Sequence, residues 1–273
     1  MSDFFVSICV PSYNRPNELL RLLRTIDCDP RGVQIVICED HAPKRLEVRE
    51  SVEIFRKESA YPIKYIENEV NKGYDWNIRD FITYADGEYI IYMGDDDGFV
   101  PHALDKLLTF LKQHRELGYV LRCSRSKSTG EHMRYFPETR FFAPGANSYQ
   151  LLYRKSVFIS GFTFKRELAR EFMTDRFDGT LLYQLYIMAE ICMQHPSAYF
   201  NEPITESFPG QKEFYFGASE KEKAHYEPNK ISVRGSTIFI AGFLKITRYM
   251  DEKYGLTSTR YVQRDMSKYS YPI

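Results

Sequence analysis

Apolar and polar positions alternate regularly along the N-terminal half of the chain, as short apolar runs separated by longer amphipathic segments. The short runs are typical of buried strands, and the segments between them carry apolar residues at helical spacing. Strands are predicted at Phe4–Val10, Val33–Cys38, Ile63–Ile66, Tyr89–Met93 and Tyr119–Cys123. Helices are predicted at Glu18–Ile26, Leu46–Lys57, Asp75–Ala85 and Pro101–His114. This alternation predicts an α/β fold with a mainly parallel sheet that is covered by helices on both faces.

The pattern beyond about residue 115 is less regular and more helical. Helices are predicted at Ala146–Tyr153, from Arg166 onward, at Leu181–Met193 and at Ile231–Tyr254, with extended chain at Arg134–Phe142 and Val157–Phe164. Glycine, aromatic and charged residues mix in Gln211–Tyr226, which is interpreted as a mobile loop. We therefore divide the chain into three segments, which are residues 1–115, 116–228 and 229–273.

Composition narrows the possible classes of protein. With 273 residues and 43% hydrophobic content, the chain is long enough for a sizeable core. Lys+Arg and Asp+Glu are equal at 37 each, so the basic excess expected of a nucleic-acid-binding protein is absent. The 5 cysteines include no CxxC pair and are typical of reduced thiols in a cytoplasmic protein. Neither a signal peptide nor an apolar stretch long enough for a transmembrane helix is visible.

Three consecutive carboxylates, Asp95, Asp96 and Asp97, follow almost directly after the predicted strand Tyr89–Met93. Adjacent negative charges repel one another, so this arrangement at the end of a buried strand is costly unless a cation offsets it. Mn²⁺ or Mg²⁺ would suit oxygen ligands and would also bridge to substrate phosphates. A solvated acidic turn is the alternative that charge alone leaves open.

Polar side chains follow three of the predicted strands. The first strand leads into Pro11-Ser12-Tyr13-Asn14-Arg15, the second into Glu39-Asp40, and the fourth into the three carboxylates. In open α/β sheets, ligands bind outside the carboxyl ends of the strands. Tyr13 offers a flat face for stacking on a base, and Asp40 can accept a hydrogen bond from a base N–H. The three strand ends together predict one crevice for a nucleoside diphosphate.

The order of these motifs resembles that of family 2 glycosyltransferases of the GT-A fold. The resemblance covers about the first 115 residues and consists of Val6–Arg15, Glu39-Asp40, Asn71-Lys72-Gly73 with Asn77, Ala85–Ile90, and the acidic residues with Pro101. It implies an inverting, non-processive, metal-dependent enzyme that moves a sugar from a nucleotide-diphosphate sugar to a hydroxyl of a glycan or lipid-linked acceptor. Bacterial surface polysaccharide synthesis is the implied setting.

The resemblance also implies roles for individual positions on the donor side. Pro11, Tyr13 and Asp40 would contact the nucleotide base, and Asn77 would line the nucleotide side of the cleft. Residues 1–115 would hold the nucleotide-sugar, residues 116–228 would hold the acceptor and the catalytic base, and residues 229–273 would be a helical extension.

For the metal, the resemblance implies Asp96 as the direct ligand of Mn²⁺ or Mg²⁺. Asp95 would contact the ribose or the metal, and Asp97 is a further candidate. The chain departs from the family's pattern at Gly94, where many relatives carry an aspartate, and at Trp76, where many carry an arginine. Because Trp76 is the only tryptophan, the QxxRW signature of processive synthases cannot be present.

The catalytic base has to be sought by position, because the family's later Glu-Asp motif is not clear in this chain. An inverting transfer needs a carboxylate within about 3 Å of the acceptor hydroxyl. Asp178, just before the helix predicted at Leu181–Met193, is our first choice, with Asp175 second and Glu190 third. An ordinary helix N-cap is the alternative for Asp178.

Other functions were weighed against this interpretation. A dinucleotide-dependent dehydrogenase would need GxGxxG after the first strand, and no glycine stands there. A nucleotidyltransferase, or a non-catalytic nucleotide-sugar-binding protein, remains as the alternative. We expect a cytoplasmic protein with a possible peripheral contact at the inner membrane face, since the C-terminal third mixes basic and aromatic residues.

Overall fold

The computed structural model describes residues 3–209, 217–227 and 230–270, and it contains one continuous mixed sheet. The strands lie in the order β3-β2-β1-β4-β9-β6-β10-β5, with β7 paired to β6 and β8 paired to β10. Their bounds are β1 Val6–Ser12, β2 Val33–Glu39, β3 Ile63–Glu67, β4 Tyr89–Tyr92, β5 Asp97–Phe99, β6 Tyr119–Ser126, β7 His132–Met133, β8 Arg140–Phe142, β9 Phe162–Lys165 and β10 Ser197–Ser207.

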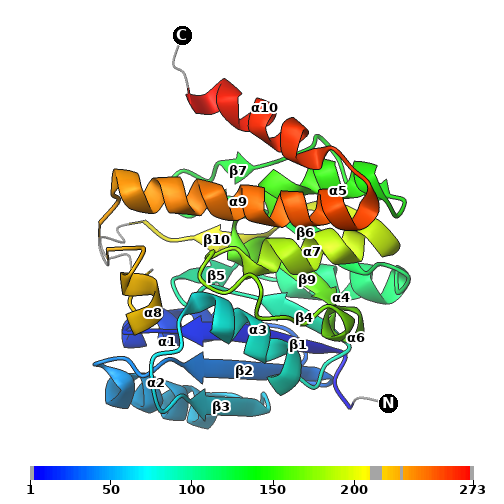
Figure 1. The fold of residues 1–273 in the computed structure, drawn as a ribbon. Coiled ribbons are helices and arrows are strands. Elements are labelled where there is room, and N and C mark those ends of the chain that lie inside the picture. Colours follow the sequence, from blue (N-terminus) through cyan, green and yellow to red (C-terminus); the bar gives the residue numbers. More distant parts are fainter. Residues whose placement is uncertain (1–2, 210–216, 228–229, 271–273) are drawn as a thin grey trace.

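Helices cover both faces of this sheet (Figure 1). Their bounds are α1 Pro16–Leu23, α2 Arg45–Glu58, α3 Tyr74–Tyr84, α4 Ala103–Gln113, α5 Ala146–Tyr153, α6 Arg166–Glu171, α7 Tyr183–Gln194, α8 Glu220–Lys223, α9 Val233–Tyr254 and α10 Ser258–Ser270. One apolar core joins the sheet to α1, α2 and α4, and the other joins it to α3, α5, α7 and α9. The fold is therefore a three-layer α/β arrangement, as the sequence predicts.

The first four strands form the parallel region of the sheet. β1 pairs in parallel with both β2 and β4, and β2 pairs in parallel with β3. All residues of β2 and β4 are buried, which explains why these strands appear in the sequence as unbroken apolar runs. The strands and helices predicted before residue 115 are confirmed, with ends that differ by a few residues.

Beyond β4 the sheet becomes mixed, and the sequence predictions are less accurate. β9 lies between β4 and β6 and pairs antiparallel with both. β10, which follows α7 in the chain, pairs in parallel with β6. The strand predicted at Val157–Phe164 is wrong over its first residues, where a short 3₁₀ turn covers Ile159–Gly161 before β9 begins at Phe162. Ser160 lies in this turn, where its hydroxyl donates to Asp97 and accepts from the Gly94 N–H.

The helices predicted at Ala146–Tyr153, Leu181–Met193 and Ile231–Tyr254 are confirmed as α5, α7 and α9, whereas β10 and α10 were not predicted. Of the loop predicted at Gln211–Tyr226, residues 211–216 lie outside the described residues, and α8 occupies some of the remainder. The division near residue 115 stays a prediction, since a single sheet continues across it. None of the helices in the described ranges is long and apolar enough to cross a membrane.

Gly87 lies in the turn before β4, and its lack of a side chain lets this turn pack closely against β1. A Cβ at this position would lie 2.5 Å from Ser7 N and 2.5 Å from Val6 C, and neither backbone atom can move aside easily. Gly87→Ala is therefore expected to lower the free energy of unfolding by about 1–3 kcal/mol, the usual cost of overpacking. Urea unfolding measures this, with Gly161→Ala as the control, because a Cβ there meets nothing closer than 3.5 Å. Equal midpoints for the two variants would contradict the prediction.

Candidate active site

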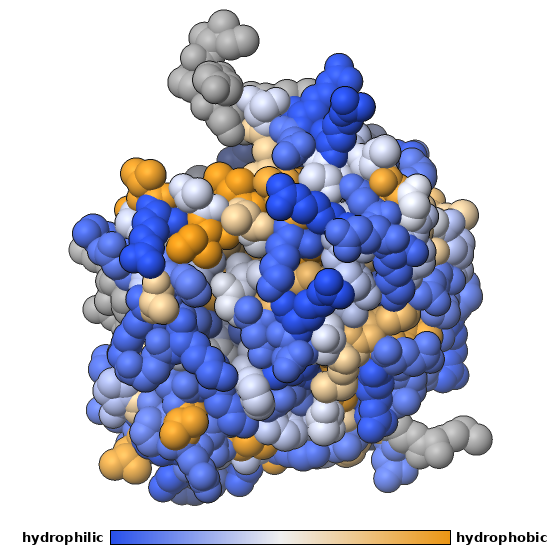
Figure 2. All heavy atoms as spheres, in the orientation of Figure 1, coloured by the Kyte–Doolittle hydropathy of each residue, from blue (hydrophilic) through white to orange (hydrophobic). Residues whose placement is uncertain are grey.

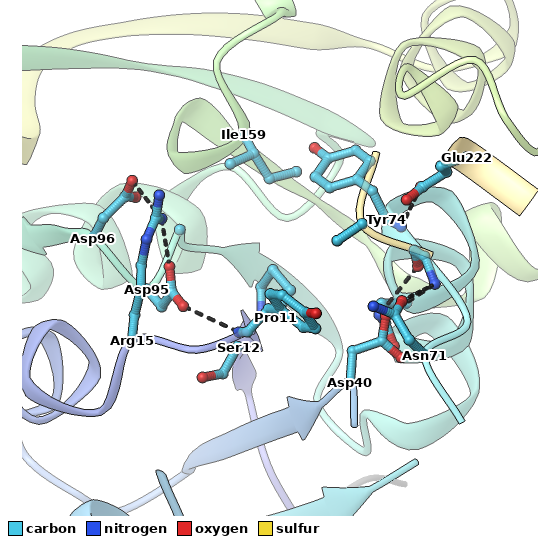
Figure 3. Close-up of a pocket in the computed structure, with 15 residues that line it drawn as sticks. Pro11, Ser12, Arg15, Asp40, Asn71, Tyr74, Asp95, Asp96, Ile159 and Glu222 are labelled. Carbon is cyan, nitrogen blue, oxygen red and sulfur yellow. Dashed lines mark hydrogen bonds and ion pairs between the residues drawn. The ribbon is translucent and has the colours of Figure 1, made fainter. Parts of the chain in front are cut away.

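A cavity of about 220 Å³ opens at the carboxyl ends of β1, β2 and β4. In Figure 3, Arg15, Asp95 and Asp96 lie at one end, and Asp40 and Asn71 lie at the other. Its lining comes from all three strand ends, the loop before α3, and two later segments: Pro11, Ser12, Tyr13, Arg15, Asp40, Asn71, Gly73, Tyr74, Asn77, Gly94, Asp95, Asp96, Ile159, Ala218 and Glu222. The structure thus gathers every donor-side residue that the sequence predicts, except Asp97, around one cavity.

Asp40 is buried, and its carboxylate accepts hydrogen bonds from other residues of the chain. Oδ1 accepts hydrogen bonds from Lys72 N (2.8 Å) and Asn68 Nδ2 (2.8 Å), and Oδ2 accepts one from Gly73 N (2.9 Å). Asp40 therefore fixes the loop that leads into α3. Its predicted contact with a base stays a prediction and would have to use the remaining lone-pair capacity of the carboxylate.

Asn77 is also buried and hydrogen-bonded within the chain. Its Nδ2 donates to Gly73 O (3.1 Å), and its Oδ1 accepts from Asn68 Nδ2 (2.9 Å) and from Cys38 Sγ (3.3 Å). Gly73 has φ of 92°, a conformation that favours glycine, so the loop and its supports form one unit. Asn77 lines the first cavity, and its place on the nucleotide side of the cleft stays a prediction.

Arg15 joins the first two carboxylates of the acidic cluster. One guanidinium nitrogen, Nη1, lies 3.0 Å from Asp95 Oδ1 and 2.7 Å from Asp96 Oδ2. Asp95 also accepts a hydrogen bond from Tyr13 N (3.3 Å). Burial raises the pKa of Asp95 to about 7, and the charge of Arg15 opposes that shift. The sequence motif contained Arg15, but its role as the counter-charge was not foreseen.

Asp97 turns away from the first cavity and lies in β5. Ser160 Oγ donates to its Oδ2 over 2.5 Å. Burial raises the pKa of Asp97 to about 7, the neighbouring charge of Asp96 adds to this, and the Ser160 hydrogen bond opposes it. Asp95 and Asp96 thus share the positive charge of Arg15, whereas Asp97 has the Ser160 hydroxyl as its partner, and these contacts offset part of the repulsion expected from the sequence.

A fully buried arginine, Arg122, lies behind the carboxylates. Its Nη2 donates to the carbonyl oxygens of Tyr92 (2.7 Å) and Phe162 (3.1 Å), so it ties β4 to β9. Burial lowers the pKa of Arg122 to about 9. Its positive charge acts in turn to lower the pKa of Asp97. Arg122 thus supports the charged end of β4 from inside the core.

The segment around α8 closes one side of the cavity. Glu222 Oε1 accepts from Tyr74 N (2.8 Å) at the start of α3, and a capping box joins Glu222 to Ser219. Burial raises the pKa of Glu222, while the Tyr74 hydrogen bond lowers it. Sequence reasoning missed Glu222, because 148 positions separate it from Tyr74. The sequence analysis interpreted this region only as a mobile loop.

A second cavity of about 520 Å³ adjoins the first, and Tyr74, Asp96 and Ile159 line both. Its other lining residues mix apolar, polar and charged side chains. They come from β5, from the segment before β9, from the start of α7 and the residue Leu181 before it, and from the chain that leads into α9: Asp97, Val157, Phe158, Leu181, Gln184, Tyr226, Glu227, Lys230, Ile231, Ser232, Gly235, Ser236 and Phe239. Asp96 therefore stands at the junction of the two cavities.

Asp178 does not belong to the lining of either cavity. Its Oδ1 accepts from Arg79 Nη1 over 2.5 Å, and burial raises its pKa while Arg79 opposes the shift. The N-cap alternative is wrong, since α7 begins at Tyr183 and Asp75 caps it by accepting from Leu181 N and Tyr183 N. Asp178 as the base stays a prediction, as does the alternative Asp175.

Asp95 and Asp96 are the carboxylates on the first cavity's wall that could hold a divalent cation of the Mg²⁺ type. Within the described ranges, no group of three or more His, Cys, Asp or Glu residues is arranged as a metal site. Such a cation, however, is commonly held by one or two carboxylates together with substrate phosphates and water. The Asp96 side chain is 24% exposed, against 7% for Asp95, so Asp96 is the residue that can reach a bound ion.

The fold and the site together place a crevice at the carboxyl ends of the parallel strands, with acidic residues after the fourth strand. The model for Glycosyl transferase family 2 matches residues 7–172 of this chain. The chain therefore belongs to glycosyl transferase family 2.

Two curated relatives match the N-terminal half. Abequosyltransferase RfbV of Salmonella typhimurium is 31% identical over 126 residues, which is 46% of this chain and 37% of that protein. An uncharacterized glycosyltransferase of Haemophilus influenzae is 25% identical over 131 residues, which is 48% of this chain and 42% of that protein. The chain thus matches less than half the length of either relative.

Solved structures resemble the fold over most of the chain. S. aureus TarS 1-349 in complex with UDP-GlcNAc has a TM-score of 0.62 and 14% identity, and the match covers 93% of this chain and 74% of that one. Mannosyltransferase PcManGT from Pyrobaculum calidifontis, in complex with GDP-Man and Mn²⁺, has a TM-score of 0.55 and 13% identity, covering 97% and 80%. These likenesses support the GT-A fold.

Proposed function

We propose that this protein is an inverting, metal-dependent glycosyltransferase that moves a sugar from a nucleotide-diphosphate sugar to a hydroxyl group. The observation that carries the proposal is the position of Asp96 between two adjoining cavities. The first cavity, with Tyr13 and Asp40 on its walls, suits the nucleotide. The second suits the acceptor, so the sugar and the diphosphate would meet beside Asp96.

In this reaction the acceptor oxygen attacks the anomeric carbon from the second cavity, and the nucleoside diphosphate leaves into the first. A divalent cation held by Asp96, with Asp95 beside it, would stabilise the charge that develops on the leaving diphosphate. Arg15, which lies between these two carboxylates, is a second positive charge within reach of that diphosphate. Asp178 is the proposed base.

A glycan or lipid-linked acceptor, as in bacterial surface polysaccharide synthesis, remains the proposed acceptor class. The relative RfbV is named as an abequosyltransferase, which supports sugar transfer. Location in the cytoplasm, with a peripheral contact at the inner membrane face, belongs to the same proposal. The 5 cysteines are buried and unpaired in the structure, which suits a reducing compartment.

A thermal-shift screen of nucleoside diphosphates and nucleotide-sugars with Mn²⁺ tests the donor side. One of these ligands at about 100 times its Kd is expected to add about 2.7 kcal/mol to the free energy of unfolding. The shift should depend on Mn²⁺, and the matching nucleosides, which lack the diphosphate, serve as controls. Release of the nucleoside diphosphate then reports turnover. Binding without any turnover would favour a non-catalytic nucleotide-sugar-binding protein.

A further inference from the structure

The outer face of α9 exposes apolar side chains along one stripe. Val233 is 87% exposed and Ile240 is 42% exposed, and the half-buried Leu244 continues the stripe at helical spacing. Ile231, just before the helix, is 82% exposed. Figure 2 shows hydrophobic residues gathered over this end of α9. Single exposed apolar side chains are ordinary, whereas a group of them on one helix marks a surface that a partner covers.

Packing of the protein core does not require this stripe. The inner face of α9 carries Phe243, Ile246 and Met250, which are buried in the core that α9 shares with α7. A surface helix normally combines such an apolar inner face with a polar outer face. Polar residues in place of Val233 and Ile240 would leave the core intact, so folding alone does not account for the exposed apolar stripe.

Basic residues accompany the stripe. The sequence from Ile231 to Met250 contains no acidic residue, and the side chains of Arg234, Lys245 and Arg248 are exposed. None of these three pairs with a carboxylate of the described chain, and Arg234 and Lys245 donate to backbone carbonyl oxygens instead. This part of the surface is therefore positively charged as well as apolar.

α10 lies against α9 and extends the basic surface. Arg260 and Arg264, one helical turn apart, are exposed and have no carboxylate partner within the described ranges. Asp265 forms a separate ion pair, and Asp251 accepts hydrogen bonds from the first turn of α10. The exposed Glu252 balances one of the basic charges, so an excess of positive charge remains over the two helices.

An apolar stripe beside arginine and lysine side chains is the pattern of helices that lie in the plane of a membrane interface. Anionic headgroups attract the basic residues, and the region between headgroups and acyl chains takes up the apolar ones. We propose that this surface docks on an anionic lipid bilayer. The docking face consists of the exposed residues of α9 from Val233 to Arg248, together with Arg260 and Arg264 of α10.

This inference rests on the proposed function, which includes a peripheral membrane contact but gives it no location. The start of α9 turns Gly235 and Phe239 toward the second cavity, whereas Val233 and Ile240 face outward. A protein docked through α9 would therefore hold that cavity close to the lipid headgroups. The docking face gives the contact its residues and its requirement for anionic lipid.

Vesicle flotation with the full chain tests the docking face. The vesicles consist of phosphatidylcholine alone, or of phosphatidylcholine mixed with phosphatidylglycerol. The protein is expected to bind at least about tenfold more tightly to the mixed vesicles. This binding should weaken as salt is raised, because salt screens the attraction between exposed charges. Equal binding to both kinds of vesicle, or binding to neither, would overturn the proposal.

Two variants separate the charged contribution from the apolar one. Arg248→Gln should weaken binding to the mixed vesicles about fivefold, the usual effect of one basic residue near a membrane surface. Val233→Ser combined with Ile240→Ser should weaken it about tenfold or more, since apolar area is no longer buried. These side chains line neither cavity, and the melting temperature should stay nearly unchanged. Lys57→Gln and Leu46→Ser are the matched controls, because both residues are exposed on α2, on the other face of the sheet.

Vesicle binding at the wild-type level in both variants would overturn the docking face. Sedimentation velocity identifies a different occupant, since a wild-type dimer that Val233→Ser with Ile240→Ser dissociates would mean that a second copy of the chain covers α9. That result would overturn the proposal as well. The thermal shift produced by the nucleotide with Mn²⁺ should persist in every variant. Failed vesicle binding with this shift retained overturns only the docking face, whereas absence of the shift in the wild-type protein contradicts the proposed function.

Discussion

Asp96→Asn is expected to lower kcat/KM by about 100- to 1,000-fold, the usual cost of removing one group that stabilises charge in a transition state. The substitution keeps the shape of the side chain and removes its charge at the junction of the two cavities. Asp95 would retain its ion pair with Arg15, so the fold around β4 should survive. The measurement is steady-state kinetics, with the melting temperature as a check on folding.

The same variant should also lose the Mn²⁺-dependent component of nucleoside diphosphate binding. Calorimetric titration with and without Mn²⁺ measures this directly. Asp105→Asn is the matched control, because Asp105 is an exposed carboxylate in the first turn of α4, outside both cavities. If Asp96→Asn binds the diphosphate with the wild-type affinity and the wild-type response to Mn²⁺, Asp96 does not hold a metal.

The donor side was predictable because its geometry follows from local patterns. Parallel strands place their carboxyl ends at one edge of the sheet, so the polar residues after β1, β2 and β4 had to lie close together. Pro11, Tyr13, Asp40, Asp95 and Asp96 line the first cavity for that reason, and Asn77 joins them from the first turn of α3. What each side chain contacts did not follow from the pattern, and the three hydrogen bonds that Asp40 accepts are an example.

The acceptor side was less predictable because it depends on contacts between distant segments. β9 pairs antiparallel with β4 and β6. The spacing of apolar residues in a strand does not tell whether that strand pairs in parallel or antiparallel. Glu222 reaches Tyr74 from a segment far along the chain, and Gln184 looks like an isolated polar residue in a buried helix. Local spacing carries no information about such contacts, so the base could only be chosen by position.

Asp178→Asn is expected to lower turnover at least about 100-fold with donor binding retained, if Asp178 is the general base. The ion pair with Arg79 favours the ionised form of Asp178 that a base requires, against the effect of burial on its pKa. Its place outside the cavity walls does not by itself exclude the role, since catalytic contacts often tighten only when both substrates are bound. Steady-state kinetics of the variant measure the effect.

The pH profile separates this role from a structural one. A base must be deprotonated to accept the hydroxyl proton, so kcat/KM of the wild type should fall as the pH drops through the pKa of Asp178, and the variant should lose that acidic limb. Removing only one partner of the pair leaves Arg79 buried and uncompensated, so a lowered melting temperature with near-normal turnover would mean that Asp178 merely anchors Arg79. In that case Asp175→Asn and Asp97→Asn are the next variants. Asp97 has the stronger geometric claim, because it already lies on the wall of the second cavity.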